Sequence, residues 1–251
     1  DGRVLTYNQL IDRGFDIFGT AEDDKLIGTA TSDRITGGAG NDTLSGKGGS
    51  DILMGAAGDD TYVFNRGDGR IVIDDVAMDG AENTLAFGEG ITLADVAGRL
   101  TYEDDRIIIR IGDEGDEIHL KGFDSNAADT GQRAVQIFQF ADGTTIRYEE
   151  LVHNTFIIQG SDSDDYLNGT NVTDRLYGYE GHDTLVGGNG DDVLTGSAGN
   201  DMLIGGAGRD LYVFNRGDGE DIIDDSFTVD ETNMIIFGDG ITADDLSFVN
   251  D

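Results

Sequence analysis

The chain has 251 residues, 51 of them Asp or Glu and 16 of them Lys or Arg, so that its formal net charge at pH 7 is −35. This charge excludes electrostatic binding to nucleic acid or to an anionic membrane surface, and it favours the binding of cations. The absence of Cys excludes disulfides, and the absence of Pro leaves regular backbone repetition uninterrupted. No apolar run is long enough for a transmembrane helix, and residues 1–10 lack the basic end and apolar stretch of a signal peptide.

A nine-residue repeat occupies residues 19–63. It occurs five times, with Gly at position one, Asp at position six and a large apolar residue at position eight. The Asp residues of this first block are Asp24, Asp33, Asp42, Asp51 and Asp60. Position four is Gly in the last three repeats but Glu22 and Thr31 in the first two. Because the ends of repeat arrays are usually atypical, we expect the first repeats to bind a ligand more weakly or to serve as caps.

Residues 64–159 follow as a flanking module that we expect to be rich in β-strands and to cap the first block. The predicted strands lie in NTLAF (83–87), RIIIRIG (106–112), DEIHLKGF (116–123) and AVQIFQFADGTTI (134–146), with short helical turns at 92–96 and 148–151. We expect FNRGDGRIV (64–72) to continue the nine-residue phase with Gly69 in place of Asp. Tyr62 and Phe64 should close the open end of the core with aromatic area.

The repeat returns six times in residues 160–213. Its Asp residues are Asp165, Asp174, Asp183, Asp192, Asp201 and Asp210, and position four of its first two repeats is Ser163 and Val172. The flanks repeat as well: TYVFNRGDG at 61 matches LYVFNRGDG at 211, and DGRVLTYNQL at 1 matches DGTTIRYEEL at 142. We therefore expect residues 1–18 to be the end of a preceding flanking segment and residues 214–251 to be a truncated second flank, in an excerpt of a tandem array.

The repeat predicts a coil of two strands and two turns. Positions seven to nine form a short strand whose position-eight side chain points into the core, and positions one to six form a turn in which Gly permits close approach of the backbone. Two repeats make one coil of 18 residues, so each position-six Asp is stacked on the Asp of the next coil, about 4.8 Å away. The stacked pairs are Asp24–Asp42, Asp33–Asp51, Asp42–Asp60, Asp165–Asp183, Asp174–Asp192, Asp183–Asp201 and Asp192–Asp210.

Such a column of carboxylates repels itself unless cations lie between them. Ca²⁺ is the predicted ion, because it takes six to eight hard oxygen ligands from carboxylates and backbone carbonyls. Zinc and copper are disfavoured, because there is no thiol and His119, His153 and His182 do not cluster. The seven stacked pairs predict about seven calcium ions, with interior Asp residues serving two ions through their two oxygens. Asp68, Asp74, Asp75, Asp218, Asp221, Asp224 and Asp225 in the flanks are open candidates for extra ions.

We expect calcium to decide whether the blocks fold. One large buried side chain per nine residues offers little apolar burial against the entropy of ordering nine backbone residues, and the carboxylates repel one another. The metal-free blocks should therefore be unfolded or molten, with binding free energy acting as folding free energy.

The repeat G-G-x-G-x-D-x-U-x, with U a large apolar residue, resembles the RTX (repeats-in-toxin) calcium-binding nonapeptide family. The resemblance implies an all-β fold of two right-handed parallel β-rolls, separated by β-rich flanking segments. It also implies that carbonyls of the turns complete each calcium shell, here those of Gly37, Ala39, Gly46, Gly48, Gly55, Ala57, Gly187, Asn189, Gly196, Ala198, Gly205 and Ala207. Family members leave Gram-negative bacteria unfolded by type I secretion. The expected protein is thus a non-catalytic, monomeric calcium-binding segment of a secreted, extracellular toxin or exoprotein.

Several other interpretations stay open or are disfavoured. The rolls could be the stiff spacer of a surface adhesin, or the accessory tail of a secreted protease, lipase or epimerase. A parallel β-helix enzyme needs a non-repeated polar cluster, and a glycosidase needs one unlike carboxylate pair, whereas acidic pairs such as Asp59-Asp60 and Asp191-Asp192 are repeated. Arg-Gly-Asp at 66–68 and 216–218 could indicate adhesion, but both copies occupy the same phase, which favours a structural role.

Overall fold

A computed structural model of the chain describes residues 13–75, 80–112, 115–131, 133–153, 156–224 and 232–247. The expectations for residues 1–12 and for Asp225 lie outside these residues. The chain divides into two compact units. Unit 1 comprises residues 1–124 and 129–152, and unit 2 comprises residues 125–128 and 153–251. The first block and most of its flank thus belong to one body.

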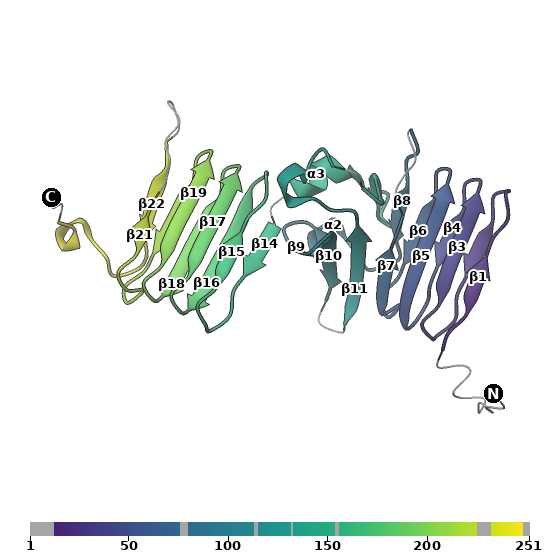
Figure 1. Ribbon diagram of the computed structural model, residues 1–251, viewed down its shortest axis with the longest axis horizontal. Coiled ribbons are helices and arrows are strands. Elements are labelled where there is room, and N and C mark those ends of the chain that lie inside the picture. Colours follow the sequence, from purple (N-terminus) through teal and green to yellow (C-terminus); the bar gives the residue numbers. More distant parts are fainter. Residues whose placement is uncertain are drawn as a thin grey trace, which may run out of the picture. The chain divides into compact units, whose positions relative to one another are not determined.

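Unit 1 begins with a roll of two parallel sheets (Figure 1). Its first sheet contains β1 (Asp16–Phe18), β3 (Arg34–Ala39), β5 (Ser50–Ala57) and β7 (Arg70–Ile73). Its second sheet contains β2 (Lys25–Ile27), β4 (Thr43–Ser45), β6 (Thr61–Phe64) and β8 (Thr84–Phe87). Ile35 pairs with Leu53 and Leu26 pairs with Leu44, so each coil spans 18 residues as predicted.

Position eight forms the core of the roll. Ile35, Leu44 and Leu53 are at most 1% exposed, and Tyr62 and Phe64 are completely buried at the end of the array. The alternation of side chains along a strand explains this, because the neighbours at positions seven and nine point outward.

The nine-residue phase ends at Phe64, so the expectation that it continues to residue 72 is wrong. Ser50 pairs with Arg70, and Thr61 pairs with Thr84, which are offsets larger than 18. The turn after β6 causes the first shift: Asp68 Oδ2 accepts the backbone N–H of Asn65, and the N–H of Asp68 donates to the Asn65 carbonyl. This closed turn needs more residues than the glycine-rich turn of a repeat.

The flank of unit 1 covers the end of the roll. It contains α2 (Leu93–Val96), β9 (Leu100–Glu103), β10 (Arg106–Ile111), β11 (Asp116–Lys121), β12 (Ile137–Gln139), β13 (Thr145–Arg147) and α3 (Tyr148–Val152). β11 pairs in parallel with β7, and β12 pairs in parallel with β8. Phe140, just after β12, stacks on Phe87 with ring centroids 4.8 Å apart. The predicted strands and helical turns are therefore present, and none of the helices among the described residues could span a membrane.

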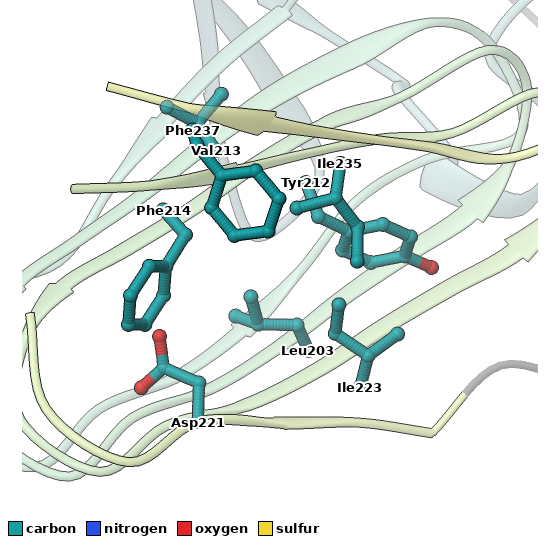
Figure 2. Close-up of a pocket in the computed structure, with 8 residues that line it drawn as sticks. All are labelled: Leu203, Tyr212, Val213, Phe214, Asp221, Ile223, Ile235 and Phe237. Atoms are coloured by element: carbon teal, nitrogen blue, oxygen red, sulfur yellow. The ribbon is translucent and has the colours of Figure 1, made fainter. Parts of the chain in front are cut away.

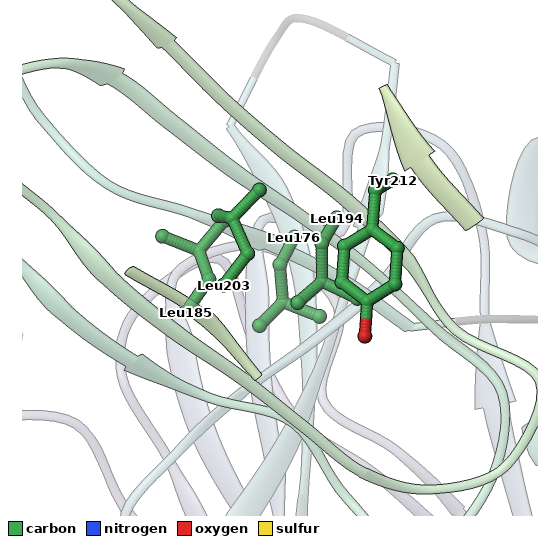
Figure 3. Close-up of a cluster of buried hydrophobic side chains, with 5 residues drawn as sticks. All are labelled: Leu176, Leu185, Leu194, Leu203 and Tyr212. Atoms are coloured by element: carbon green, nitrogen blue, oxygen red, sulfur yellow. The ribbon is translucent and has the colours of Figure 1, made fainter. Parts of the chain in front are cut away.

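Unit 2 repeats the roll (Figure 1). One sheet contains β14 (Phe156–Gln159), β16 (Asp174–Glu180), β18 (Val193–Ala198), β20 (Leu211–Phe214) and β22 (Met234–Phe237). The other contains β15 (Tyr166–Asn168), β17 (Thr184–Asn189), β19 (Met202–Ala207) and β21 (Ile222–Ile223). The 3₁₀ helices η1 (Ser125–Ala127) and η2 (Ala243–Asp245) lie outside the sheets. Figure 3 shows the core row, formed by Leu176, Leu185, Leu194, Leu203 and Tyr212.

The far end of the second roll has an apolar cavity of about 150 Å³ (Figure 2). Ile235 and Phe237, which line it, are 49% and 39% exposed, whereas their counterparts Leu85 and Phe87 in unit 1 are at most 4% exposed. In unit 1 β11 and β12 cover this end, and the described part of unit 2 contains no counterpart of these strands.

Candidate metal centres

Each position-six Asp is tied to the Asp one coil later. The backbone N–H of Asp24 donates to Oδ1 of Asp42 at 2.8 Å, and the same bond recurs at 2.8–3.0 Å in all seven predicted pairs. The structure therefore brings together every predicted pair. It also shows that Oδ1 accepts a backbone N–H, and the division of one oxygen to each of two ions stays a prediction.

The second carboxylate oxygen has no donor in the interior repeats. Oδ2 is buried and makes no hydrogen bond in Asp42, Asp51, Asp60, Asp183, Asp192 and Asp201. These six residues are at most 2% exposed. A buried anionic oxygen without a partner costs free energy that a bound cation would recover.

A backbone carbonyl converges with the free oxygen of Asp42, Asp183 and Asp192 on the space beside a position-one Gly. A Cβ placed on Gly37 would lie 2.1 Å from Asp42 Oδ2 and 2.8 Å from the carbonyl oxygen of Gly55. The same space, between Asp Oδ2 and a position-one carbonyl of the next coil, recurs at Gly178 and Gly187. Gly37 is thus required by close approach rather than by backbone conformation, because its φ is outside the left-handed region.

The predicted carbonyl ligands divide into two groups. All six position-one carbonyls converge with an Asp Oδ2 on the space beside a position-one Gly: those of Gly37, Gly46, Gly55, Gly187, Gly196 and Gly205. The Gly178 carbonyl, which sequence reasoning omitted, does the same beside Asp165. At position three, the carbonyls of Ala198 and Ala207 instead accept N–H groups of Gly181 and Gly190. The roles of Ala39, Gly48, Ala57 and Asn189 stay predictions.

The first two repeats of each block differ from the interior ones. Asp24 Oδ2 accepts the N–H and the hydroxyl of Thr20, at 2.6 and 2.8 Å. Thr29, Ser161 and Thr170 bind the Oδ2 atoms of Asp33, Asp165 and Asp174 in the same way. A position-two hydroxyl therefore supplies the partner that interior repeats lack, which gives a physical reason to expect weaker metal binding there.

Burial raises the pKa of several column carboxylates. Desolvation is the largest cause, and it raises the pKa to about 6 for Asp51 and Asp60 and to about 7 for Asp174. The pKa of Asp192 rises to about 8, with the Asp174 and Asp210 charges adding to desolvation. These carboxylates are therefore difficult to ionise in the folded chain without a compensating cation.

The donor set fits Ca²⁺. The sites beside Gly37, Gly178 and Gly187 each offer a carboxylate oxygen and a backbone carbonyl oxygen, and oxygen ligands of this kind suit a hard cation. Among the described residues, no three His, Cys, Asp or Glu side chains gather into a metal cluster. The resident ion must therefore take much of its shell from the backbone, as the phased turns allow.

The columns end differently from what the sequence indicated. Asn83 Oδ1 accepts the N–H of Asp60, and Asn233 Oδ1 accepts that of Asp210, so a neutral amide replaces the next Asp. The only signal in the sequence was the Asn directly before β8 and before β22. In unit 2 the other Asp column continues by one residue, because the backbone N–H of Asp201 donates to Oδ1 of Asp221. The equivalent position in unit 1, paired with Asp51, is Ile71.

Most flank carboxylates have structural partners. Asp68 and Asp218 bind the N–H groups of Asn65 and Asn215, and Asp74 pairs with Lys121 at 3.0 Å. Asp75 accepts hydrogen bonds from the Tyr62 hydroxyl and the Asn83 amide. In both copies of Arg-Gly-Asp the arginine binds a backbone carbonyl, Arg66 that of Gly90 and Arg216 that of Gly240. The motif is structural, as expected.

A second ladder, which the sequence did not reveal, runs along position five. The N–H of Asn200 donates to His182 Nδ1 at 2.9 Å, and that of His182 donates to Asp164 Oδ1. The N–H of Asp59 donates to Asn41 Oδ1 in unit 1. The two members of an acidic pair such as Asp59-Asp60 thus bond within different ladders rather than acting together.

Comparisons with known proteins agree with this geometry. A model of the RTX calcium-binding nonapeptide repeat (4 copies) matches residues 18–53, 38–71 and 177–212, and a model of the haemolysin-type calcium binding protein related domain matches residues 107–150. No curated protein matches the chain. Among solved structures, the extracellular lipase LipA from Serratia marcescens is similar at 18% identity over 92% of this chain and 39% of its own, with a TM-score of 0.23.

The two family models therefore match two parts of the chain that have different places in the structure. The repeat model falls on the coils whose Asp columns are described above, and the related-domain model falls on the flank that covers the first roll. Residues 18–71 and 177–212, which form coils of the parallel β-rolls, are therefore RTX calcium-binding nonapeptide repeats.

Proposed function

We propose that this chain is a calcium-driven folding segment of a secreted RTX protein. The observation that carries the proposal is the set of buried Oδ2 atoms that lack a donor, those of Asp42, Asp51, Asp60, Asp183, Asp192 and Asp201. Three of them, those of Asp42, Asp183 and Asp192, also lie beside a backbone carbonyl. Without a cation these oxygens oppose the folded state, and with calcium bound they would stabilise it. The interior repeats would hold the ions most tightly, and the first two repeats of each block would serve mainly as caps.

The folding of each entire roll would depend on the bound ions. Each coil contributes only two core side chains, such as Leu44 and Leu53, and its neighbours are joined to it by the Asp-to-backbone bonds. About seven divalent ions would also offset part of the formal charge of −35. Folding and ion binding are then one equilibrium, displaced by the calcium concentration.

Such a segment suits export in an unfolded state. A chain that is unfolded at the low calcium concentration inside the cell could pass through the type I machinery. It would fold outside, where the calcium concentration is high enough to fill its sites. Folding outside would oppose backward movement and help to structure neighbouring regions of the parent toxin or exoprotein. On this proposal the segment is non-catalytic and monomeric, and it acts in the extracellular medium of a Gram-negative bacterium.

An adhesin spacer and the tail of a secreted hydrolase are the alternatives. Both use the same rolls, but a spacer would need a roll that remains stiff at all physiological calcium concentrations. A folding switch instead requires a transition within the range between the cell interior and the medium.

The test is a far-UV circular dichroism titration of the metal-free chain with calcium, with magnesium as the control. We expect a coil-to-β transition with calcium and none with magnesium, because Mg²⁺ demands a rigid octahedral shell and releases water reluctantly. A β-rich spectrum in the metal-free state that calcium leaves unchanged would refute the folding switch.

A further inference from the structure

The outer face of the sheet β2–β4–β6 in unit 1 carries a cavity of about 220 Å³ with no acidic residue in its lining. Lys25 and Ile27 of β2 pair with Thr43 and Ser45 of β4, so all four side chains point outward. Lys47 follows two residues after Ser45 and lines the same cavity. The two lysines therefore lie on either side of Ser45 along the strand direction, on a face distinct from the Asp columns in the turns.

Both lysines lack an acidic partner. Most of the other described lysines and arginines form an ion pair, for example Lys121 with Asp74 at 3.0 Å and Arg110 with Glu117 at 3.1 Å. Within the described parts of the chain, no carboxylate forms an ion pair with Lys25 or Lys47. In a chain with 51 acidic residues, this cavity is lined by two lysines that form no ion pair and by no carboxylate.

Ser45 adds a buried donor between them. The residue is 5% exposed, and its hydroxyl is buried without a hydrogen-bond partner. A buried hydroxyl normally has a partner, because removing it from water without one is unfavourable. Ile27 and Val63 on the neighbouring strands line the cavity with Ser45 and shield it from the charges of the turns.

Lys47 occupies a conformation that suits Gly. Its φ is +72°, in the left-handed region, and it takes position two of a repeat where Gly38 stands one repeat earlier with φ +124°. A lysine at this place is less favourable than a glycine in the folded state. Ala56, Tyr179 and Ser197 adopt a similar φ at position two of their repeats, so the conformation belongs to the repeat. Lys47 differs from them in bringing a positive charge to the lining of the cavity.

We propose that this cavity binds a small oxyanion, a sulfate or phosphate group, through the ammonium groups of Lys25 and Lys47 and the hydroxyl of Ser45. Three donors, two of them charged, then meet one compact anion, and charge-assisted bonds of this kind are the stronger ones. The net charge of the chain excludes extended polyanions but not a single group held in a local, acid-free cavity, where the nearest charges dominate.

Unit 2 provides an internal comparison. Its last repeats match those of unit 1 at an offset of 150 residues, and the places of Lys25, Ser45 and Lys47 are taken by Arg175, Thr195 and Ser197. Ser197 has the same strained φ of +72° as Lys47 but no charge. A substitution of Ser197 therefore reproduces the backbone effect of a substitution of Lys47 without touching the proposed anion site.

The experiment uses the calcium-saturated chain and follows ¹⁵N-labelled backbone amide shifts during addition of sodium sulfate, at an ionic strength held constant with sodium chloride. We expect saturable shifts confined to residues 25–29 and 43–47. Lys47→Gly should keep the fold, because Gly suits this φ, yet weaken sulfate binding by about tenfold or more. Lys25→Gln and Ser45→Ala should weaken it as well, and Ser197→Gly should leave it unchanged.

Three results would overturn the proposal: shifts that chloride alone reproduces, shifts that do not saturate, or a Lys47→Gly chain that binds sulfate as well as the parent. The calcium-induced folding transition is measured separately, so its failure and the failure of the anion site are distinguishable. Sulfate rather than inorganic phosphate is the probe, because phosphate precipitates calcium.

Discussion

The backbone N–H of Asp42 donates a hydrogen bond of 2.8 Å to Oδ1 of Asp60, one coil later. The same Asp42 presents its own Oδ1 to the N–H of Asp24 and leaves Oδ2 buried without a donor. Each interior Asp thus has two separate tasks, because one oxygen joins consecutive coils and the other is available to a cation. Loss of the charge and loss of the acceptor should therefore have different consequences.

Asp42→Asn tests this division. The amide oxygen can still accept the N–H of Asp24, but the position of Oδ2 is taken by an uncharged donor. We expect the calcium concentration at the folding midpoint to rise by about tenfold or more, equivalent to about 1.4 kcal/mol per tenfold step, as measured by circular dichroism. Asp24→Asn is the matched control, because Thr20 already occupies Oδ2 of Asp24. Equal shifts in the two variants would contradict the assignment.

The stability of the metal-free chain should decrease as the pH rises. Folding raises the pKa of Asp51 and Asp60 to about 6 and that of Asp192 to about 8, from a normal value of 3.8. Between the normal and the raised pKa the folded state binds protons that the unfolded state does not, so a rise in pH favours unfolding. We expect more β-structure at pH 5 than at pH 8 in chelated, metal-free buffer.

Saturating calcium should abolish this trend, because the calcium-bound carboxylates and those of the unfolded chain are both ionised between pH 5 and pH 8. Protons then stabilise only the metal-free folded state, so the calcium concentration at the folding midpoint should decrease as the pH falls from 8 to 5. Circular dichroism titrations at the two pH values measure both effects. Metal-free β-structure that increases with pH would show that the buried carboxylates do not control folding.

Sequence reasoning succeeded where the structure is periodic. Because the coil length follows from the repeat, Asp42 and Leu44 predict a place in the column and in the core, and the structure places them there. Gly37 was expected in a turn but lies within β3, because the strands continue from position seven through position three of the next repeat. The strands of the flank were also predictable, since their alternation of side chains is local.

The parts that were missed depend on closure of the chain in space. Asn83 replaces the next Asp of a column only because β8 is paired with β6 at an offset of 23 residues, which no repeat predicts. The phase break after Phe64 arises from hydrogen bonds within a single turn. That Oδ1 binds a backbone N–H was equally hidden, because stacking alone does not tell which oxygen faces the neighbouring coil.

Gly37→Ala should remove a metal site without altering the charge. Its new Cβ would lie 2.1 Å from Asp42 Oδ2, within the space where a ligand oxygen and an ion must meet. We expect a higher calcium midpoint and a lower transition amplitude in the circular dichroism titration. Gly48→Ala is the control, because a Cβ there would approach Ala30 no closer than 3.6 Å and the φ of Gly48 is not left-handed. Similar effects of both substitutions would mean that glycine acts through flexibility alone.

The Tyr62 hydroxyl should stabilise the end of the first roll. It accepts the N–H of Gly55 at 2.9 Å and donates to Asp75, and all of these groups are buried or partly buried. Tyr62→Phe leaves a buried N–H and a buried carboxylate each short of a partner, while the aromatic core contact stays. We expect the free energy of unfolding of the calcium-loaded chain to fall by about 1–3 kcal/mol, measured by urea unfolding.

Tyr177→Phe is the appropriate comparison for this change, since the Tyr177 ring stacks on Tyr179 on the outer face of the second roll. Its substitution removes a hydroxyl that the buried network does not use and should alter the free energy of unfolding little. If Tyr62→Phe also left the free energy of unfolding unchanged, the Tyr62 hydroxyl would not stabilise the end of the roll. The Asp column of unit 1 would then end only at the Asn83 amide, as that of unit 2 ends at the Asn233 amide, which accepts the N–H of Asp210.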